Sequence, residues 1–207
     1  MALQTASTTQ GSRASGYDGM QPTETRRMST TTLTLHEGRF LRLCQRGRWE
    51  FVERTNASCA VIIVAVTPDQ EVLFVEQYRE AIGCKTIEMP AGLVGDIDAS
   101  ESIELAAERE LLEETGWSCD RVETLMSGPS SSGMSNEMIV FARAQGLRHV
   151  GPGGGDASEA ITVHCVPLTS AAHWLNAQRL AGFSIDPKLY AGLYFTAHDP
   201  DGSPISP

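Results

Sequence analysis

Alternating apolar and polar residues dominate the first part of the chain and predict strands. Residues 31–38 alternate in this way, and residues 40–54 predict two strands joined by a turn at Arg46–Gly47. Residues 59–79 predict a longer hairpin with its turn at Thr67–Gln70. The first arm of this hairpin is almost entirely apolar, so we expect it to be buried on both faces.

A helix is predicted after a short strand at residues 86–92, which Pro90 and Gly92 bring to an end. Ser100 is the expected N-cap of the helix, and Gly116 is its expected C-terminal stop. An apolar stripe at helical spacing supports the helix: Ile103, Ala107 and Leu111.

Strands and helices also follow one another in the second half of the chain. Strands are predicted over residues 122–128, 137–146 and 160–168. Helices are predicted from residue 169 or 170 to 180 and over residues 186–195. The mixture of strands and helices predicts an α/β (α+β) domain.

The two ends of the chain differ in composition from the middle. Residues 1–30 are rich in Ser, Thr, Gly and Gln and have almost no large apolar residues, so we expect a disordered extension. Three arginines and few acidic residues leave a targeting role open for this segment. Residues 199–207 are expected to form a tail.

Charge and composition restrict the class of protein. The 207 residues suffice for one domain with a sizeable core, and the formal charge of −10 argues against a protein that coats nucleic acid. No apolar run approaches the length of a membrane span, and no signal-peptide pattern is present. The five cysteines form no CxxC pair, so we expect free thiols and a cytoplasmic location.

The sequence RELLEETG, residues 109–116, gives the predicted helix an acidic face. Glu110, Glu113 and Glu114 lie at i, i+3 and i+4, and like charges at this spacing repel one another. The sequence offers no obvious basic partner for this face. A solvated acidic surface is one interpretation. The other is a metal site, because Mg²⁺ and Mn²⁺ prefer carboxylate oxygens.

The residues around this face form a pattern of fixed spacing that resembles the Nudix box of hydrolases that cleave nucleoside diphosphates linked to another group. The pattern positions are Gly95, Glu101, Arg109, Glu110, Leu111, Glu113, Glu114 and Gly116. The resemblance implies a mixed β-sheet between helices, with Glu110 and Glu114 as the main metal ligands. Glu113 would bind metal directly or through water. Among the catalytic residues, Glu101 would support the site and Arg109 would orient the carboxylates.

Three further stretches resemble the ADP-ribose and nucleoside-diphosphate-sugar branch of this family. In EMPAG the resemblance gives Ala91 a metal-binding carbonyl and places Glu88 at the substrate, although Glu88 could instead pair with an arginine. In WEFVER and EQYR it implies that Trp49 stacks on the base and that Arg54 and Arg79 contact phosphate or ribose. A core position for Trp49 and a surface position for Arg79 are the alternatives.

The sequence departs from the pattern of this branch in two places. In this branch the glycine of Pro-Ala-Gly is usually also the first glycine of the Nudix box. Here Gly92 and Gly95 divide these two roles, so the loop before the helix is longer. Ser132 replaces a proline in SSSGMSNE, the loop in which Gly133 and Met134 are expected to contact substrate, and this loosens the loop.

The resemblance places the catalytic base on a loop after the box. Glu159 is the first choice and Glu137 the alternative; Glu113 is a further catalytic candidate. We expect metal-dependent hydrolysis of ADP-ribose or a related nucleoside-diphosphate sugar. The alternatives are GDP-mannose, a nucleoside triphosphate, or nucleotide-sugar binding without catalysis. The resemblance also implies a homodimer formed through residues 31–56, with residues 57–198 as the hydrolase domain.

Overall fold

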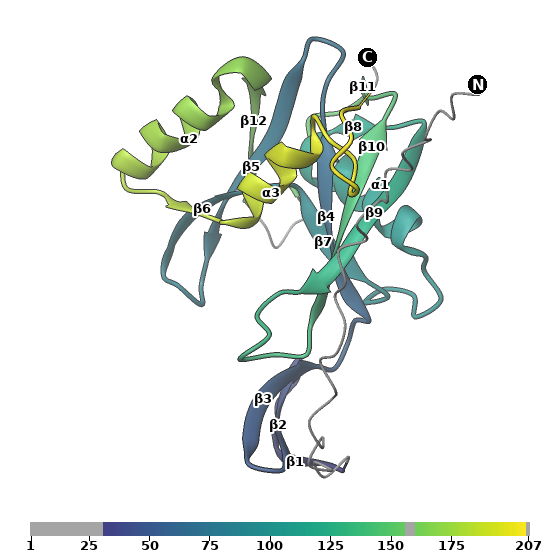
Figure 1. Ribbon diagram of the computed structural model, residues 1–207, viewed down its shortest axis with the longest axis vertical. Coiled ribbons are helices and arrows are strands. Elements are labelled where there is room, and N and C mark those ends of the chain that lie inside the picture. The colour runs from purple at the N-terminus through teal and green to yellow at the C-terminus, as the bar shows by residue number, and fades with distance from the viewer. Residues whose placement is uncertain (1–30, 156–159, 206–207) are drawn as a thin grey trace, which may run out of the picture.

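The computed structural model describes residues 31–155 and 160–205 and shows a body of sheets and helices from which one small sheet extends (Figure 1). This small sheet is antiparallel and has three strands: β1 (Thr32–Glu37), β2 (Leu41–Arg46) and β3 (Trp49–Arg54). The predicted turn between β2 and β3 is confirmed. Gly47 adopts a φ of 64° there, which glycine reaches without strain.

The first sheet of the body has the order β7-β4-β10-β9. Its strands are β4 (Cys59–Ala65), β7 (Ala91–Val94), β9 (Arg121–Pro129) and β10 (Met138–Gln145). The β4–β10 pair is parallel, whereas the β4–β7 and β9–β10 pairs are antiparallel. A separate short ladder joins β8 (Trp117–Ser118) to β11 (Arg148–His149).

The second sheet of the body has the order β12-β5-β6-β13. Its strands are β5 (Glu71–Arg79), β6 (Cys84–Glu88), β12 (Thr162–Pro167) and β13 (Ser184–Ile185). The β6–β13 pair is parallel and the other two pairs are antiparallel.

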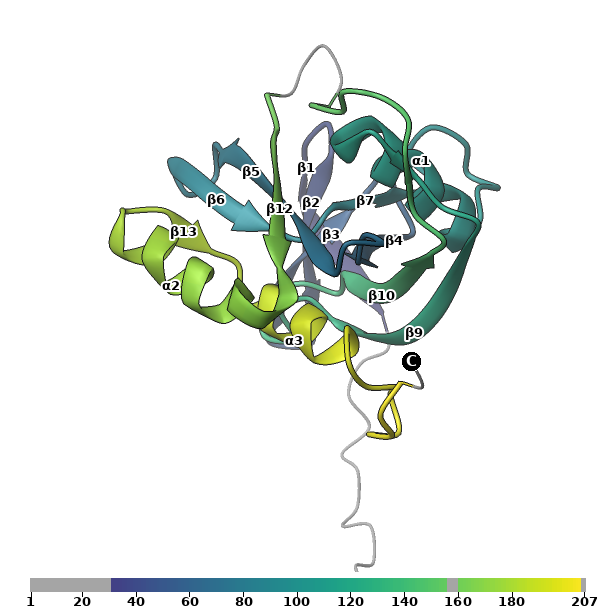
Figure 2. The same ribbon diagram turned by 90° about the horizontal axis from the view of Figure 1, so that it is seen from above.

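The helices cover the sheets from two sides, and alternate residues of β4 face each side. The helices are α1 (Ile103–Thr115), α2 (Ala171–Leu180) and α3 (Lys188–Phe195), with a 3-10 turn, η1 (Leu168–Ser170), before α2. Ile62 and Val64 pack in the core formed with α2 and α3, whereas Val61 and Ile63 pack in the core formed with α1. Figure 2 shows α1 opposite α2 and α3. The expected α/β fold, and the burial of β4 on both faces, are confirmed.

The predicted hairpin over residues 59–79 is wrong as a strand pair. The turn at Thr67–Gln70 exists, because the Thr67 amide donates to the Glu71 carbonyl at 2.8 Å. Beyond a single bridge between Val66 and Val72, however, β4 and β5 belong to different sheets. Each strand pairs instead with partners that come later in the chain, which the local sequence pattern does not reveal.

The strand predicted over residues 86–92 is likewise divided between the two sheets. β6 ends at Glu88 and β7 begins at Ala91, with Pro90 between them. The Pro90 carbonyl accepts a hydrogen bond from the Ile63 amide at 2.8 Å. Proline cannot donate to a ladder, so the chain changes sheets where pairing is weakest.

Helix α1 begins two residues later than predicted. Ser102 is the N-cap and its hydroxyl accepts from the Leu105 amide, whereas the Ser100 hydroxyl donates to Asp98. The predicted stop at Gly116 is confirmed, with a φ of 73°. None of the helices within residues 31–155 and 160–205 is long and apolar enough to cross a membrane.

One buried charged group stabilises the second sheet on the face covered by α2. Glu76 is 8% exposed, accepts a hydrogen bond from the Lys85 ammonium at 2.6 Å, and lies 3.1 Å from Nε2 of His164. The His164 ring packs against Trp174 of α2. The Lys85 hydrogen bond, more than the effect of His164, lowers the pKa of Glu76 below its ordinary value of 4.5 despite burial.

We predict that Glu76→Gln lowers the free energy of unfolding by about 1–2 kcal/mol at pH 7, because hydrogen bonds to a charged group are lost. The folded-state pKa is lowered, so this contribution is complete above pH 4.5 and disappears as the pH falls through the folded-state value. Urea unfolding across pH measures the difference from the wild type. Glu71→Gln, on the same strand, is the matched control, and an equal Glu76→Gln deficit at pH 7 and in acid would contradict the prediction.

Candidate functional site

A cleft of about 680 Å³ lies between the two sheets of the body. Helix α1 and strands β4 and β7 contribute one wall, and β5, β6 and β13 contribute the other. The cleft therefore depends on the division of residues 59–79 and 86–92 between the sheets, since each of these segments supplies one strand to each wall.

Two glutamates of the acidic helix face line the cleft, Glu110 and Glu114. Glu114 is 3% exposed, and its Oε2 accepts from the Ala91 amide of β7 at 3.0 Å. Burial raises the pKa of Glu110 to about 6, although the neighbouring Arg109 guanidinium opposes the shift. Gly92 makes room for Glu110, because a Cβ at Gly92 would lie 2.0 Å from the Glu110 Cδ.

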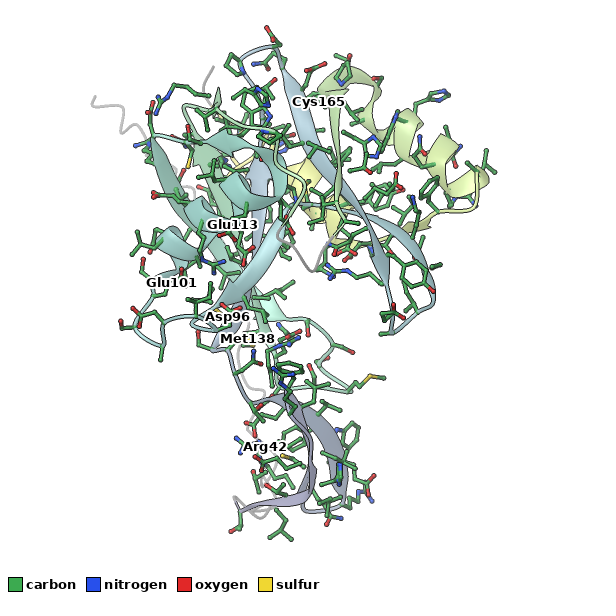
Figure 3. The ribbon with its side chains drawn as sticks, turned by 180° about the vertical axis from the view of Figure 1, so that it is seen from behind. Arg42, Asp96, Glu101, Glu113, Met138 and Cys165 are labelled. Atoms are coloured by element: carbon green, nitrogen blue, oxygen red, sulfur yellow. The ribbon has the colours of Figure 1, made fainter. Side chains whose placement is uncertain are left out.

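Arg109 is a basic partner for the acidic face, as its predicted role in orienting the carboxylates implies. Its guanidinium contacts four carboxylates at 2.9–3.5 Å: Asp96, Glu101, Glu110 and Glu113. The Glu101 hydrogen bond is the largest of the effects that raise the pKa of Arg109, and the same contact lowers the pKa of Glu101. Figure 3 shows the labelled Asp96, Glu101 and Glu113 on the same side of the body. The predicted roles of Glu101 and Arg109 in supporting the site fit this geometry.

The other two predicted metal ligands, Glu113 and Ala91, differ in their position relative to the cleft. The Glu113 side chain is 47% exposed, contacts Arg109 at 3.3 Å and is not among the residues that line the cleft. Ala91 does line the cleft, and its amide holds the carboxylate of Glu114 in place.

The chemistry of these residues fits a divalent metal ion. Within residues 31–155 and 160–205, no three His, Cys, Asp or Glu side chains group into a complete metal site. Mg²⁺, however, is commonly bound by one or two carboxylates together with water and substrate phosphates. Glu110 and Glu114 supply two hard oxygen donors at the cleft, and the absence of a Cβ at Gly92 is required for this arrangement.

The two predicted substrate-binding arginines line the cleft, each held by a carboxylate. Arg79 makes a bidentate contact with Glu88, at 2.7 Å for both hydrogen bonds. Arg54 donates from Nε to Glu137 Oε1 at 2.9 Å. The alternative considered for Glu88, pairing with an arginine, is therefore what the structure shows, and Glu88 also lines the cleft.

Three predicted substrate-binding residues are not brought to the cleft of this chain. Trp49 is 53% exposed on β3, Met134 is 66% exposed, and a Cβ added at Gly133 would meet open space. The Met134 carbonyl accepts from the Val52 amide at 2.8 Å, so this loop joins the small sheet to the body. Glu159 lies outside the described residues.

Several cleft residues were missed by the sequence analysis: Gln77, Thr86, Asp96, Ser184, Asp186 and Lys188. Gln77 and Thr86 could have been found, because each is two positions from a predicted site residue on the same strand, Arg79 and Glu88. Asp96 gave no signal in its loop. The residues from 184 onwards reach the cleft only because β13 pairs with β6.

Comparison with known proteins gives the family. A family model described as the NUDIX domain matches residues 58–186, more than half of the 207 residues. The chain belongs to the Nudix family, and the resemblance of its glutamate motif is confirmed. Members of the branch that hydrolyses ADP-ribose generally require a divalent metal ion.

The chain is similar to curated proteins whose names describe different functions. The chain is 32% identical over 122 residues to the methanol dehydrogenase activator of Bacillus methanolicus, covering 58% of this chain and 64% of that protein. It is 37% identical over 114 residues to the ADP-ribose pyrophosphatase of Mycobacterium tuberculosis, covering 55% and 54%. The chain thus spans between half and two thirds of the length of these relatives.

A solved structure shows the same fold. The crystal structure of an ADP compounds hydrolase matches with a TM-score of 0.62 and 20% sequence identity, covering 81% of this chain and 90% of that chain. At this identity the similarity supports the fold.

We predict that Gly92→Ala lowers the affinity for divalent metal by about 10–100-fold, because the added Cβ displaces the Glu110 carboxylate. Titration with Mn²⁺ followed by electron paramagnetic resonance measures the affinity. Gly151→Ala is the control, since a Cβ there meets open space. An unchanged Mn²⁺ affinity in Gly92→Ala would show that Glu110 does not depend on this space.

Proposed function

We propose that this protein hydrolyses the diphosphate of ADP-ribose or a related nucleoside-diphosphate sugar, giving a nucleoside monophosphate and a sugar phosphate. The observation that carries the proposal is the cleft itself, with Glu110 and Glu114 on one wall and Arg79 on the other. The name of the ADP-ribose pyrophosphatase relative supports this substrate class.

The carboxylates of α1 would hold Mg²⁺ or Mn²⁺, with Glu110 and Glu114 as ligands from the chain and Glu113 as a further ligand through water. Bound metal polarises phosphoryl oxygens and lowers the pKa of a coordinated water. Arg109 keeps the Glu110 carboxylate oriented through its contact at 2.9 Å. The Ala91 amide does the same for Glu114 at 3.0 Å.

Arg54 and Arg79 would bind the diphosphate oxygens from the remaining sides of the cleft. Both guanidiniums are already oriented, since Glu137 and Glu88 hold them by hydrogen bonds of 2.7–2.9 Å. A pre-oriented arginine loses less conformational entropy on binding phosphate, and its planar fork matches two phosphate oxygens. In this proposal Glu88 acts through Arg79.

The catalytic base would be Glu159, with Glu137 as the alternative. Glu137 lines the cleft, but one of its oxygens accepts from Arg54, so its geometry suits orienting that arginine. We therefore keep Glu159 as the proposed proton acceptor. The five free cysteines support the proposed cytoplasmic location.

Turnover of a substrate panel tests the proposed function. We expect ADP-ribose or another nucleoside-diphosphate sugar to be hydrolysed with Mg²⁺ or Mn²⁺, and we expect EDTA to abolish the reaction because the carboxylates of α1 act through metal. Product analysis should give a nucleoside monophosphate and a sugar phosphate. Faster turnover of nucleoside triphosphates would favour the triphosphate alternative, and tight binding without hydrolysis would favour a binding module.

Comparing Glu114→Gln with Glu108→Gln tests whether the measured activity arises in this cleft. Glu114→Gln should lower kcat by about 100–1,000-fold, because a neutral amide is a weaker ligand than a carboxylate for the divalent metal ion that stabilises the diphosphate. Its side-chain oxygen can still accept from Ala91, so circular dichroism and the melting temperature should stay close to those of the wild type. Glu108→Gln is the matched control, since Glu108 is an exposed residue of the same helix.

We also propose that residues 31–56 form a dimerisation element beside a hydrolase domain of residues 57–198. One face of the small sheet supports this, because it presents three exposed leucines. Leu33, Leu41 and Leu43 are 56%, 47% and 37% exposed. Strand register places them on the same face, since Leu33 lies opposite Gln45 of β2. The sheet extends away from the body, where a second copy can reach it (Figure 1).

We predict a solution mass of two chains by light scattering. Leu41→Glu should shift the mass towards one chain, because a charge is costly in an apolar interface. Leu180→Glu, which replaces an exposed leucine at the end of α2, should leave the mass unchanged. A wild-type mass of one chain would refute the proposed dimer.

A further inference from the structure

Three uncharged polar side chains form a row on the β5–β6–β13 wall of the cleft. Gln77 of β5 lies directly opposite Thr86 of β6, and Thr86 lies directly opposite Ser184 of β13. Residues opposite one another on adjacent strands point to the same face of a sheet. All three line the cleft, so we call Gln77, Thr86 and Ser184 the neutral row.

One polar group of this row, the Thr86 hydroxyl, is buried without a hydrogen-bond partner within the described part of the chain. Thr86 is 4% exposed, and its hydroxyl makes no hydrogen bond there. Gln77, opposite it on β5, is 8% exposed. Ser184 is half-buried beside them. A buried hydroxyl without a partner lowers stability by about 1–3 kcal/mol, so its position beside two further polar side chains at the cleft indicates a surface that is completed by a ligand.

The row differs in charge from the strand positions beside it. Arg79 and Glu88 are two residues further along the same strands and form an ion pair. Arg79 stands opposite Cys84 and reaches Glu88, so its side chain passes Thr86, which lies between those two positions of β6. Gln77 and Ser184, at the two sides of Thr86, are therefore the members of the row that a ligand meets first.

The chemistry of the row suits hydroxyl groups. An amide and two hydroxyls offer both donors and acceptors without charge, as a polyhydroxyl group requires. A phosphate would instead favour the charged positions at Arg54 and Arg79. Among the described residues that line the cleft none is aromatic, so a nucleobase finds no ring to stack on there.

We propose that the neutral row binds the hydroxyl groups of the sugar on the far side of the diphosphate and so selects sugar-bearing substrates. This inference rests on the proposed function and extends it, because it assigns the residues that distinguish a nucleoside-diphosphate sugar from other diphosphate esters. The phosphates bind at the metal and the arginines, and Gln77 and Ser184 contact the hydroxyls of the leaving half.

The test compares ADP-ribose with the butyl ester of ADP, which has the same diphosphate but no sugar hydroxyls beyond it. Gln77→Met keeps the shape of the side chain and removes its amide, and Ser184→Ala removes a hydroxyl. Each should lower kcat/KM for ADP-ribose by about 5–10-fold, the loss expected for one hydrogen bond. Neither should change kcat/KM for the butyl ester.

Two controls distinguish recognition from damage to the fold. Ser184→Thr keeps a hydroxyl on the strand and should restore the wild-type preference for ADP-ribose. Gln178→Met, on α2, should leave both substrates unaffected. Equal losses on the two substrates in Gln77→Met and Ser184→Ala would overturn the proposal, because the residues would then be structural. An unchanged preference would also overturn it.

Failure of the proposed function is separable from failure of this inference. If the wild type hydrolyses neither compound with Mg²⁺ or Mn²⁺, the hydrolase proposal fails, and the row is then tested by calorimetric binding with Ca²⁺. Wild-type protein should bind ADP-ribose more tightly than the butyl ester, and Gln77→Met should reduce this difference by about 5–10-fold. Equal affinities in the wild type would refute the inference.

Discussion

The contacts of Arg109 are the interaction on which the rest of the site depends. One guanidinium lies among four carboxylates, and it also donates to the Leu93 carbonyl of β7 at 3.3 Å. It therefore offsets the repulsion on the acidic face of α1 and fixes that helix against the first sheet. Because Glu110 is buried enough to raise its pKa to about 6, this neighbouring positive charge favours its ionised form. The same contacts thus serve packing and chemistry.

The cleft exists because the chain twice passes from one sheet to the other. β4 and β7 belong to the first sheet, whereas β5 and β6 between them belong to the second. The carboxylates of α1 pack against the first sheet, and the Arg79–Glu88 pair belongs to the second. The wall that carries the α1 carboxylates and the wall that carries the Arg79–Glu88 ion pair therefore face each other across a cleft of about 680 Å³. In the proposed reaction, a diphosphate between these walls reaches metal from one side and guanidinium from the other.

Much of the site was predictable because its residues lie in short local patterns. The i, i+3, i+4 spacing alone places Glu110, Glu113 and Glu114 on one helix face. The stop at Gly116 follows from the same local rules, whereas those rules favoured Ser100 as the N-cap and the structure has Ser102. Contacts between residues on different strands and helices were not predictable from the sequence. The Arg79–Glu88 pair joins two strands, and only the register of β5 with β6 brings their side chains together.

The sequence by itself determined the family pattern, the strand and helix content, and the identity of the acidic face. Each of these depends on residues that are close to one another along the chain. The tertiary structure decided which strands pair, that Arg109 serves four carboxylates, and that Gln77, Thr86 and Ser184 form one row. Glu113, equal to Glu110 and Glu114 in the sequence pattern, is the one that stays outside the cleft. The physical reason is that burial and strand pairing are set by long-range packing, which the local sequence does not specify.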